Sequence, residues 1–189
     1  MLKNAEFRMQ NAEFRDLRSA LLKEKGKSMS IFKSNKKENN NRHFTVCGIL
    51  EIDGKILLVR HTYGTAKDRI LLPGGYVKEN EIPTISAERE ILEETGVACK
   101  SKELYCMQFK ADQWCAVFTM EYISGTPKSD GYENSEVLLL TTDEALARDD
   151  LTNMSREILK AYKENKTGLK KSNYIAKACD ETNYAIFGV

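Results

Sequence analysis

Three glutamates stand close together in one predicted helix. Glu90, Glu93 and Glu94 lie at positions i, i+3 and i+4, so at about 100° per residue they share one side of the helix. Carboxylates at this spacing repel one another, and a divalent cation would remove the repulsion, because hard oxygen ligands suit Mg²⁺ and Mn²⁺. Surface helices are also often rich in glutamate. The three residues alone therefore indicate either a metal site for phosphate chemistry or a solvated acidic face.

The predicted elements around these glutamates are a strand, a tight loop and a helix. Ile70–Leu72 is apolar and runs into Pro-Gly-Gly, which must end the strand. Pro83 suits a first helical turn, and residues 84–95 contain no further Gly or Pro. Gly96 follows where a left-handed helix cap is wanted. We expect this helix to bring the glutamates beside the glycine loop.

The rest of the chain predicts an α/β (α+β) fold, with a mixed sheet covered by helices on both faces. Phe44–Ile52 and Lys55–Arg60 are rich in Val, Ile and Leu. They are joined by Asp53-Gly54, a dipeptide preferred in two-residue hairpin turns. Further strands are predicted over 104–110, 114–123 and 137–140, and an amphipathic helix over 152–164.

The loop and the helix together contain the pattern G-x5-E-x7-R-E-U-x-E-E-x-G-U, in which U is aliphatic. Every fixed position is met between Gly75 and Val97, and Leu-Pro-Gly-Gly introduces the pattern. On these residues the chain resembles the Nudix hydrolase family, also called MutT-like, over about residues 42–165. The resemblance implies a Nudix-type α-β-α sandwich with a mixed β-sheet, in which this strand, loop and helix hold a catalytic metal and a diphosphate.

The resemblance also implies a set of metal ligands. The carbonyl of Gly75 and the carboxylates of Glu90, Glu93 and Glu94 match the family's ligand positions. Mg²⁺ is the implied cofactor, with Mn²⁺ as the alternative. In some relatives the residue that matches Glu90 acts as the base instead, so Glu90 is expected both as a ligand and as a catalytic residue.

Further catalytic residues are expected at two places. Arg89 can fold back over Glu81 in the loop and orient the carboxylates through a charge-assisted hydrogen bond. Relatives often take a water-activating or metal-binding glutamate from a later loop, where this chain offers Glu133 and Glu136. We expect Glu136 to act, because it adjoins a predicted strand, whereas Glu133 lies at the tip of the loop.

Four residues are expected to bind substrate. Gly74 has no side chain, so the backbone can approach a phosphate or metal closely. Arg60, Arg69 and Lys78 stand in flanking segments where they could neutralise phosphates. Each of these three cations could equally be a solvated surface charge, which would contribute little.

The reaction implied is Mg²⁺-dependent hydrolysis of a diphosphate bond in a nucleoside diphosphate-linked small molecule. No Ser/His/Asp or Cys/His arrangement with a supporting motif competes, so we expect direct attack of water at phosphorus. The residues that mark hydrolases of ADP-ribose or of dinucleoside polyphosphates are missing downstream, where Asp112–Cys115 stand. Neither substrate class is therefore favoured. The alternative function is a Nudix-like domain that senses a nucleotide without cleaving it.

The chain divides into a basic extension and an acidic body. Residues 1–42 carry 11 Lys/Arg against 5 Asp/Glu, and the remainder carries 18 against 23. Phe7, Phe14 and Leu21 recur at heptad spacing, which predicts an amphipathic helix. We expect this apolar stripe to pack on the body or on a second subunit, as in a homodimer, and not on nucleic acid. The expected domains are 1–41 for the basic extension and its linker, 42–165 for the Nudix hydrolase domain, and 166–189 for a C-terminal tail.

The composition gives no sign of a membrane or secreted protein. The longest uncharged run is eight residues, against about 20 apolar residues for a spanning helix, and residues 1–10 lack the apolar centre of a secretory signal. The five cysteines form no Cys-x-x-Cys pair, which predicts small buried hydrophobes in a reducing compartment. We therefore expect a cytoplasmic protein that acts on a small nucleotide.

Overall fold

The computed structural model describes residues 43–177 and 179–188. These ranges fall in one compact unit, Arg42–Val189, and the predicted extension with its Phe7, Phe14 and Leu21 stripe lies outside the described residues. The strands are β1 His43–Ile52, β2 Lys55–His61, β3 Ile70–Leu71, β4 Gly74–Tyr76, β5 Ala98–Phe109, β6 Gln113–Ser124, β7 Asn134–Leu140 and β8 Leu169–Lys170. The helices are α2 Pro83–Thr95, α3 Thr142–Leu146 and α4 Asn153–Glu164, with a 3₁₀ turn η1 at Gly64–Ala66.

Strand β1 is the central element of a mixed sheet. It pairs in parallel with β6 over most of its length, and antiparallel with β4 and β2. β5 follows beyond β6, while β3 and β7 both pair with β2. The hairpin between β1 and β2 turns at Asp53 and Gly54, both with positive φ, which is the backbone that a type I′ turn requires. The predicted hairpin is confirmed.

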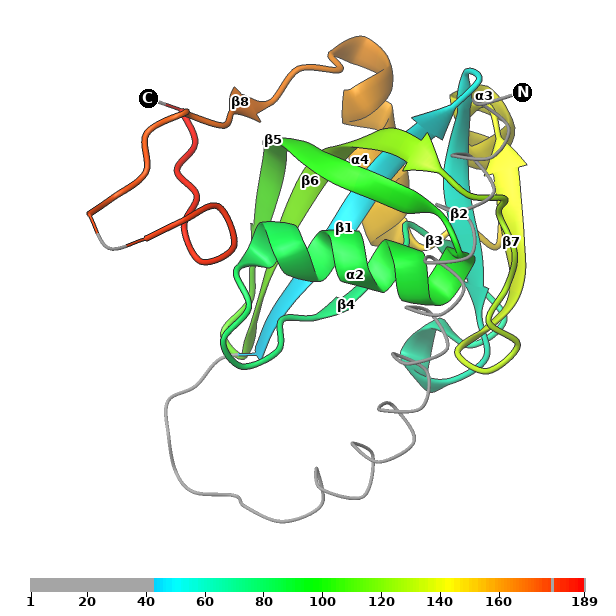
Figure 1. The fold of residues 1–189 in the computed structure, drawn as a ribbon. Helices are drawn as coiled ribbons and strands as arrows, with labels where there is room; N and C mark the ends of the chain where they lie inside the picture. The colour runs from blue at the N-terminus through cyan, green and yellow to red at the C-terminus, as the bar shows by residue number, and fades with distance from the viewer. Residues whose placement is uncertain (1–42, 178, 189) are drawn as a thin grey trace, which may run out of the picture. The chain divides into compact units, whose positions relative to one another are not determined.

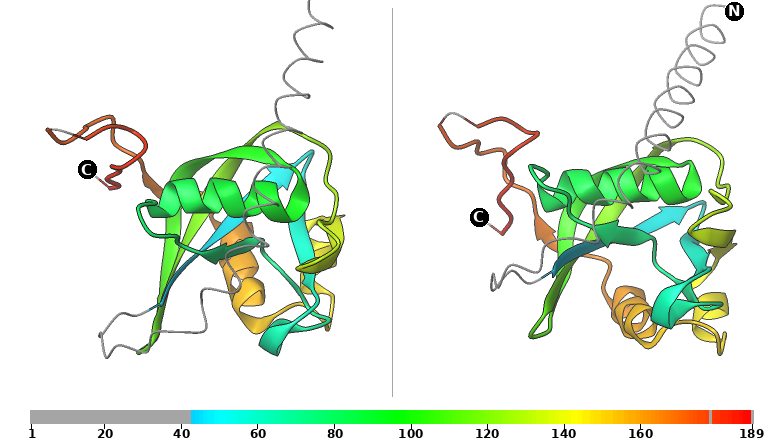
Figure 2. Two further views of the ribbon diagram at one scale, coloured as in Figure 1. Left: turned by 60° about the horizontal axis from the view of Figure 1, so that its bottom comes forward. Right: turned by 90° about the horizontal axis from the view of Figure 1, so that it is seen from below.

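Helices cover both faces of this sheet, as Figures 1 and 2 show. Helix α2 lies on one face, where Ala87 and Ile91 belong to a buried cluster with Phe118 of β6. Helix α4 lies on the opposite face, where Leu159 belongs to a second buried cluster with Ile49 of β1. The predicted sandwich of helix, mixed sheet and helix is therefore confirmed.

Several strands differ from the predicted ones: β7 begins at Asn134 and not at residue 137, β8 was not predicted, and β5 and β4 differ as follows. β5 begins at Ala98, well before the strand predicted over 104–110. Its pairing shifts register after Ser101 and after Leu104, so the alternation of apolar and polar residues that marks a strand is interrupted. β4 was not predicted at all, because glycine has a low strand propensity, yet its two glycines pair with β1.

Gly96 ends α2 in the left-handed region, with φ 71°, and its N–H donates to the carbonyl of Leu92. This confirms the predicted cap. We expect Gly96→Ala to lower the free energy of unfolding by about 1 kcal/mol, because a Cβ is disfavoured at positive φ. Gly96→Asn should lose less, since Asn tolerates this conformation. Urea denaturation of both variants measures the effect, and equal stability of Gly96→Ala and the wild type would contradict it.

The C-terminal tail returns to the sheet. β8 pairs antiparallel with β5 at Glu103 and Leu104, and the ring of Phe187 lies 5.7 Å from that of Phe118.

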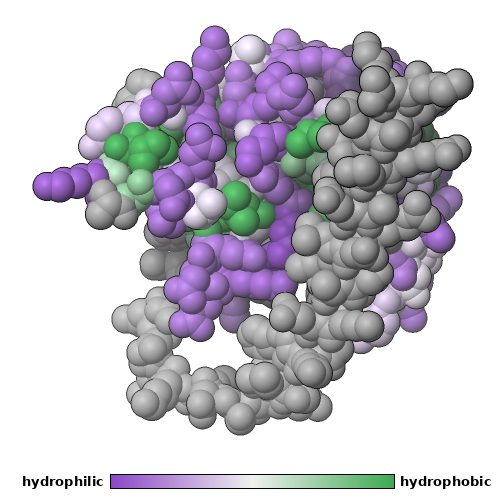
Figure 3. All heavy atoms as spheres, in the orientation of Figure 1, coloured by the Kyte–Doolittle hydropathy of each residue, from purple (hydrophilic) through white to green (hydrophobic). Residues whose placement is uncertain are grey.

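The face of the described residues that Figure 3 shows is mostly hydrophilic, with separate hydrophobic patches. No helix in the two described ranges is long and apolar enough to cross a membrane.

The five cysteines are all free thiols. Cys99 and Cys115 are buried, and Cys47 and Cys106 are partly buried, as expected for small hydrophobes in strands. Cys179 is exposed, and the prediction of a buried side chain was wrong there, because it lies in the tail and not in the sheet.

Candidate active site

The three clustered glutamates are buried. The exposed fraction is 6% for Glu90 and 1% for each of Glu93 and Glu94. A solvated acidic face would leave these carboxylates in water, so that interpretation is wrong. Burying three carboxylates is costly unless hydrogen bonds and opposite charges offset the loss of hydration. The charges and hydrogen bonds around the three carboxylates therefore determine whether they can bind a metal ion.

Two glycines allow the carboxylates to lie against the loop. A Cβ on Gly75 would stand 2.5 Å from the carboxyl carbon of Glu90, and a Cβ on Gly74 would stand 2.0 Å from the carbonyl oxygen of Val46. The N–H of Gly74 donates to Oε2 of Glu94 at 2.9 Å. Gly74, which we expected to bind substrate, thus holds Glu94 in place and fits closely against β1.

Arg89 links the glutamates of the helix to the loop. Its Nε donates to Oε1 of Glu81 at 2.9 Å, and its Nη2 donates to Oε2 of Glu81 at 2.9 Å and to the carbonyl of Tyr76 at 3.0 Å. Its Nη1 donates to both Glu90 and Glu93. Burial acts to lower the pKa of Arg89, but the bonds and charges of these glutamates outweigh it and raise the pKa. The guanidinium therefore stays charged, and the predicted fold-back over Glu81 is observed.

Negative charge exceeds positive charge in the contacts around this cluster. Three glutamates contact Arg89, namely Glu81, Glu90 and Glu93. The Nζ of Lys78 lies 3.5 Å from Oε1 of Glu93, and Glu94 adds a fourth carboxylate beside them. Burial raises the pKa of Glu94, although the N–H of Gly74 and the nearby His61 oppose the shift. A divalent cation would offset this excess of buried negative charge.

A metal ion fits the chemistry of this donor set. Carboxylate and main-chain carbonyl oxygens are the hard ligands that Mg²⁺ prefers, and Gly75, Glu90, Glu93 and Glu94 offer both kinds. Within the described ranges, no three acidic, His or Cys side chains are already grouped to hold a metal. Arg89 bridges Glu90 and Glu93 through Nη1, and each carboxylate keeps further lone pairs that the guanidinium does not use and that a cation could occupy.

Two of the three predicted phosphate-binding cations are held elsewhere. Nη1 of Arg60 donates to Asp150 at 2.9 Å, and Nη2 of Arg69 donates to the carbonyl of Leu151 at 2.7 Å. Both arginines therefore tie the β2 and β3 edge to the segment before α4, and the structure does not support a phosphate-binding role for them. Lys78 is the predicted cation that reaches the cluster.

The two candidate glutamates lie differently from the expectation, because Glu136 belongs to β7, which begins at Asn134, and only Glu133 lies in the loop before it. Glu136 has a half-exposed side chain and accepts a hydrogen bond from Nε of Arg60 at 3.0 Å. Glu133 instead contributes to the charges that raise the pKa of Glu94. Its carbonyl accepts from the N–H of Thr62 at 3.0 Å, so the loop tip is fastened beside the end of β2. The preference for Glu136 rested on its place beside a predicted strand, whereas Glu133 was expected at a solvated loop tip. The bond from Thr62 shows that the backbone at Glu133 is held in place as well.

Sequence reasoning missed His61 as a neighbour of the site. Its Nε2 lies 3.7 Å from Oε1 of Glu94, and its ring stacks on Tyr63 at 5.3 Å. The signal available in the sequence was its position at the end of β2, directly after an apolar strand. That signal is weak, because nothing local shows which carboxylate a strand end will face.

Comparison with known proteins identifies the class of this fold and site. A family model described as NUDIX domain matches residues 39–162. An ADP-ribose pyrophosphatase of Methanocaldococcus jannaschii is 33% identical over 130 residues, which cover 65% of this chain and 74% of that protein. The chain therefore belongs to the NUDIX domain family. It is a Nudix hydrolase, and the alternative of a domain that only senses a nucleotide is set aside.

Solved structures agree with this assignment. A NUDIX hydrolase from Nitrosomonas europaea superimposes with a TM-score of 0.62 and 26% identity, covering 70% of this chain and 76% of that chain. A MutT NUDIX hydrolase from Burkholderia pseudomallei gives a TM-score of 0.57 and 24% identity, covering 64% of this chain and 97% of that chain. The second likeness supports the fold alone.

Proposed function

We propose that this enzyme hydrolyses the diphosphate bond of a nucleoside diphosphate-linked small molecule, with Mg²⁺ or Mn²⁺ held by Gly75, Glu90, Glu93 and Glu94. The observation that carries the proposal is the burial of the three glutamates against the glycine loop. A helix with a purely structural role gains nothing from burying three carboxylates together, because the loss of hydration has to be offset.

The roles of the residues follow from their contacts. A bound Mg²⁺ would neutralise the diphosphate and lower the pKa of its water. Arg89 holds Glu90 and Glu93, and the N–H of Gly74 holds Glu94, so the ligands stay oriented. Lys78 is the half-exposed cation that can meet an incoming phosphate. Water then attacks one phosphorus directly, the bridging P–O bond breaks, and the products are a nucleoside monophosphate and a phosphorylated remainder.

A substrate panel tests this function. ADP-ribose comes first, because the relative from Methanocaldococcus jannaschii bears the name of an ADP-ribose pyrophosphatase. Nucleoside triphosphates, oxidised nucleotides, nucleotide sugars and dinucleotides complete the panel, each assayed for phosphate-containing products with Mg²⁺ and with EDTA. We expect cleavage of at least one diphosphate-linked compound with Mg²⁺ and none with EDTA. Cleavage of nothing in the panel, or undiminished cleavage in EDTA, would refute the proposal.

The two candidate glutamates give a further prediction. We propose Glu133, in place of Glu136, as the carboxylate that assists the reaction, because its backbone is bonded to Thr62, next to His61, whose Nε2 lies 3.7 Å from Oε1 of Glu94. Glu133→Gln should lower kcat by about 100-fold or more, the range for general acid–base assistance. Glu136→Gln, three positions further on and at the start of β7, is the matched control and should leave kcat within about threefold, since an exposed ion pair contributes little. The reverse order of effects would restore Glu136.

A further inference from the structure

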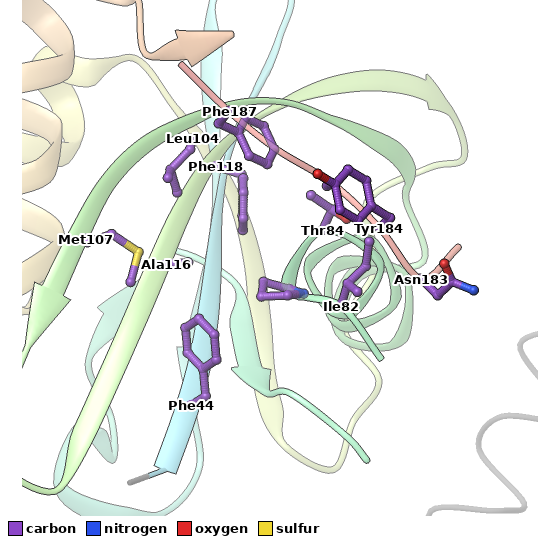
Figure 4. Close-up of a pocket in the computed structure, with 12 residues that line it drawn as sticks. Phe44, Ile82, Thr84, Leu104, Met107, Ala116, Phe118, Asn183, Tyr184 and Phe187 are labelled. Carbon is purple, nitrogen blue, oxygen red and sulfur yellow. The ribbon is translucent and has the colours of Figure 1, made fainter. Parts of the chain in front are cut away.

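The two ends of α2 have different surroundings. Residues of its first turn line a cavity of ≈ 280 Å³, together with residues of the sheet and of the C-terminal tail (Figure 4). None of the described residues that line this cavity is charged. The last turn of α2 contains Glu94, whose Oε1 lies 3.7 Å from Nε2 of His61 at the end of β2. A polar neighbour that the proposed hydrolysis does not yet use is therefore found at the C-terminal end of α2.

A shift in strand register sets the position of His61. The pairing of β2 with β7 is irregular between Arg60 and His61, and such bulges turn a side chain away from the regular alternation and are frequent beside active sites. The N–H of His61 donates to the carbonyl of Arg69 at 3.1 Å, and its carbonyl accepts from the N–H of Asp68 at 2.8 Å. The backbone therefore fixes the direction in which the imidazole leaves the strand.

The imidazole of His61 has one nitrogen without a partner. Its side chain is 14% exposed, and its ring stacks on that of Tyr63 at 5.3 Å, with 17° between the planes. Nε2 is buried and has no hydrogen-bond partner within residues 43–177 and 179–188. A buried polar atom in this state costs free energy, and native structures rarely keep one without a reason. An approach of about 0.5 Å would bring it within hydrogen-bond distance of Oε1 of Glu94.

The carboxylate of Glu94 lies between two donors. Its Oε2 accepts from the N–H of Gly74 at 2.9 Å, and its Oε1 is the oxygen that faces His61. A carboxylate that accepts a hydrogen bond at each oxygen cannot rotate about its terminal bond without losing one of them. Residues that do not touch the metal commonly orient metal-binding carboxylates in this way.

We propose that His61 is a positioning residue, which donates from Nε2 to Oε1 of Glu94 and so, together with the N–H of Gly74, orients this carboxylate for a divalent cation. The inference rests on the proposed function, because that function assigns Glu94 to the metal. Both the neutral and the charged imidazole can carry a proton on Nε2, so the role requires no change of charge. His61 acts through Glu94 and is not itself a catalytic residue.

Calorimetric titration of the full chain with Mn²⁺ alone tests this role. His61→Phe keeps a ring beside Tyr63 and removes the N–H, so the Kd for Mn²⁺ should rise about 10- to 100-fold, the range for losing a residue that orients a metal ligand. His61→Gln keeps an N–H donor near the position of Nε2 and should recover most of the affinity. His43→Phe alters the only other histidine of the chain, which is exposed, and should bind Mn²⁺ like the wild type.

Turnover of the compound that the panel identifies gives a second readout. For His61→Phe, the Mg²⁺ concentration at half-maximal rate should rise about 10- to 100-fold, while kcat at saturating Mg²⁺ stays within about threefold of the wild type. The melting temperature in EDTA should stay within about 4 °C of the wild type, whereas a purely structural role would lower it without regard to metal. If His61→Phe does not fold, His61→Met matches Gln in length, lacks the donor and gives the same comparison.

The outcomes separate this role from the proposed function. Wild-type affinity for Mn²⁺ in a folded His61→Phe or His61→Met protein would overturn the role of His61, as would equal losses with and without the donor. Failure of the wild type to bind Mn²⁺, or wild-type affinity in Glu94→Gln, would refute the ligand assignment itself. A loss of affinity confined to Glu94→Gln would count against His61 alone.

Discussion

Glu94→Gln is expected to lower kcat on the true substrate by at least about 100-fold, the loss typical of removing one preorganised electrostatic group. The substitution keeps the size of the side chain, and the amide oxygen can still accept from the N–H of Gly74. It removes one negative charge from the proposed metal ligands. Steady-state turnover at saturating Mg²⁺ measures the effect, and wild-type turnover by this variant would contradict the ligand assignment.

The stability of the same variant separates lost chemistry from lost folding. Burial raises the pKa of Glu94 above its ordinary value, so the folded state favours the protonated acid. That contribution to stability is full below the ordinary glutamate pKa and is lost as the pH rises through the raised one. An amide at this position cannot ionise, so Glu94→Gln should unfold at a higher urea concentration than the wild type at neutral pH without metal. Glu157→Gln, on an exposed position of α4, is the matched control and should change neither turnover nor stability.

Arg89→Met is expected to lower the free energy of unfolding by about 3–5 kcal/mol in metal-free buffer, the cost of leaving buried charges without their partner. Glu81, Glu90 and Glu93 would all lose the same guanidinium. Arg89→Lys should recover only part of the loss, because an ammonium cannot copy the planar fork that serves several acceptors at once. Urea denaturation at neutral pH measures both variants.

An arginine outside the site supplies the control for this prediction. Arg148 pairs with Asp150 at 2.7 Å and is partly exposed, so Arg148→Met should cost no more than about 1 kcal/mol. Added Mg²⁺ should restore part of the stability of Arg89→Met, since a cation that binds only the folded state stabilises it. Equal losses for Arg89→Met and Arg148→Met would show that the buried network contributes no more than a surface ion pair.

The helix and its glutamates were predictable because the signals are local. Pro83 and Gly96 fix the ends of α2 through backbone conformation, and the spacing of Glu90, Glu93 and Glu94 fixes their common side. Their burial could not be read from spacing alone, since an acidic helix face looks the same in water. The pattern of residues around the glutamates indicated a metal site and not a solvated face. The structure gives the physical reason, because Gly75 has no side chain and Glu90 can lie against the loop.

The roles that could not be judged from the sequence depend on contacts between residues distant along the chain. Arg60 is held by Asp150, which lies 90 positions away along the chain, so its phosphate-binding role could not be judged from its own neighbourhood. Glu133 has the sequence surroundings of a solvated loop tip, yet Thr62 fastens that loop beside β2. Charged side chains at the ends of strands have no periodic pattern that would indicate their partners. Only the assembled sheet therefore shows whether such a side chain has a structural or a catalytic role.

The most direct measurement of the central claim is hydrolysis in H₂¹⁸O of the compound that the panel identifies, followed by mass spectrometry of both products. We expect the label in the phosphate of one product, as direct attack of water at phosphorus requires, and formation of both products only when Mg²⁺ is present. The variant that combines Glu93→Gln with Glu94→Gln should form neither product above background. Full turnover by that variant, or in EDTA, would contradict a reaction that depends on a metal held by the buried carboxylates.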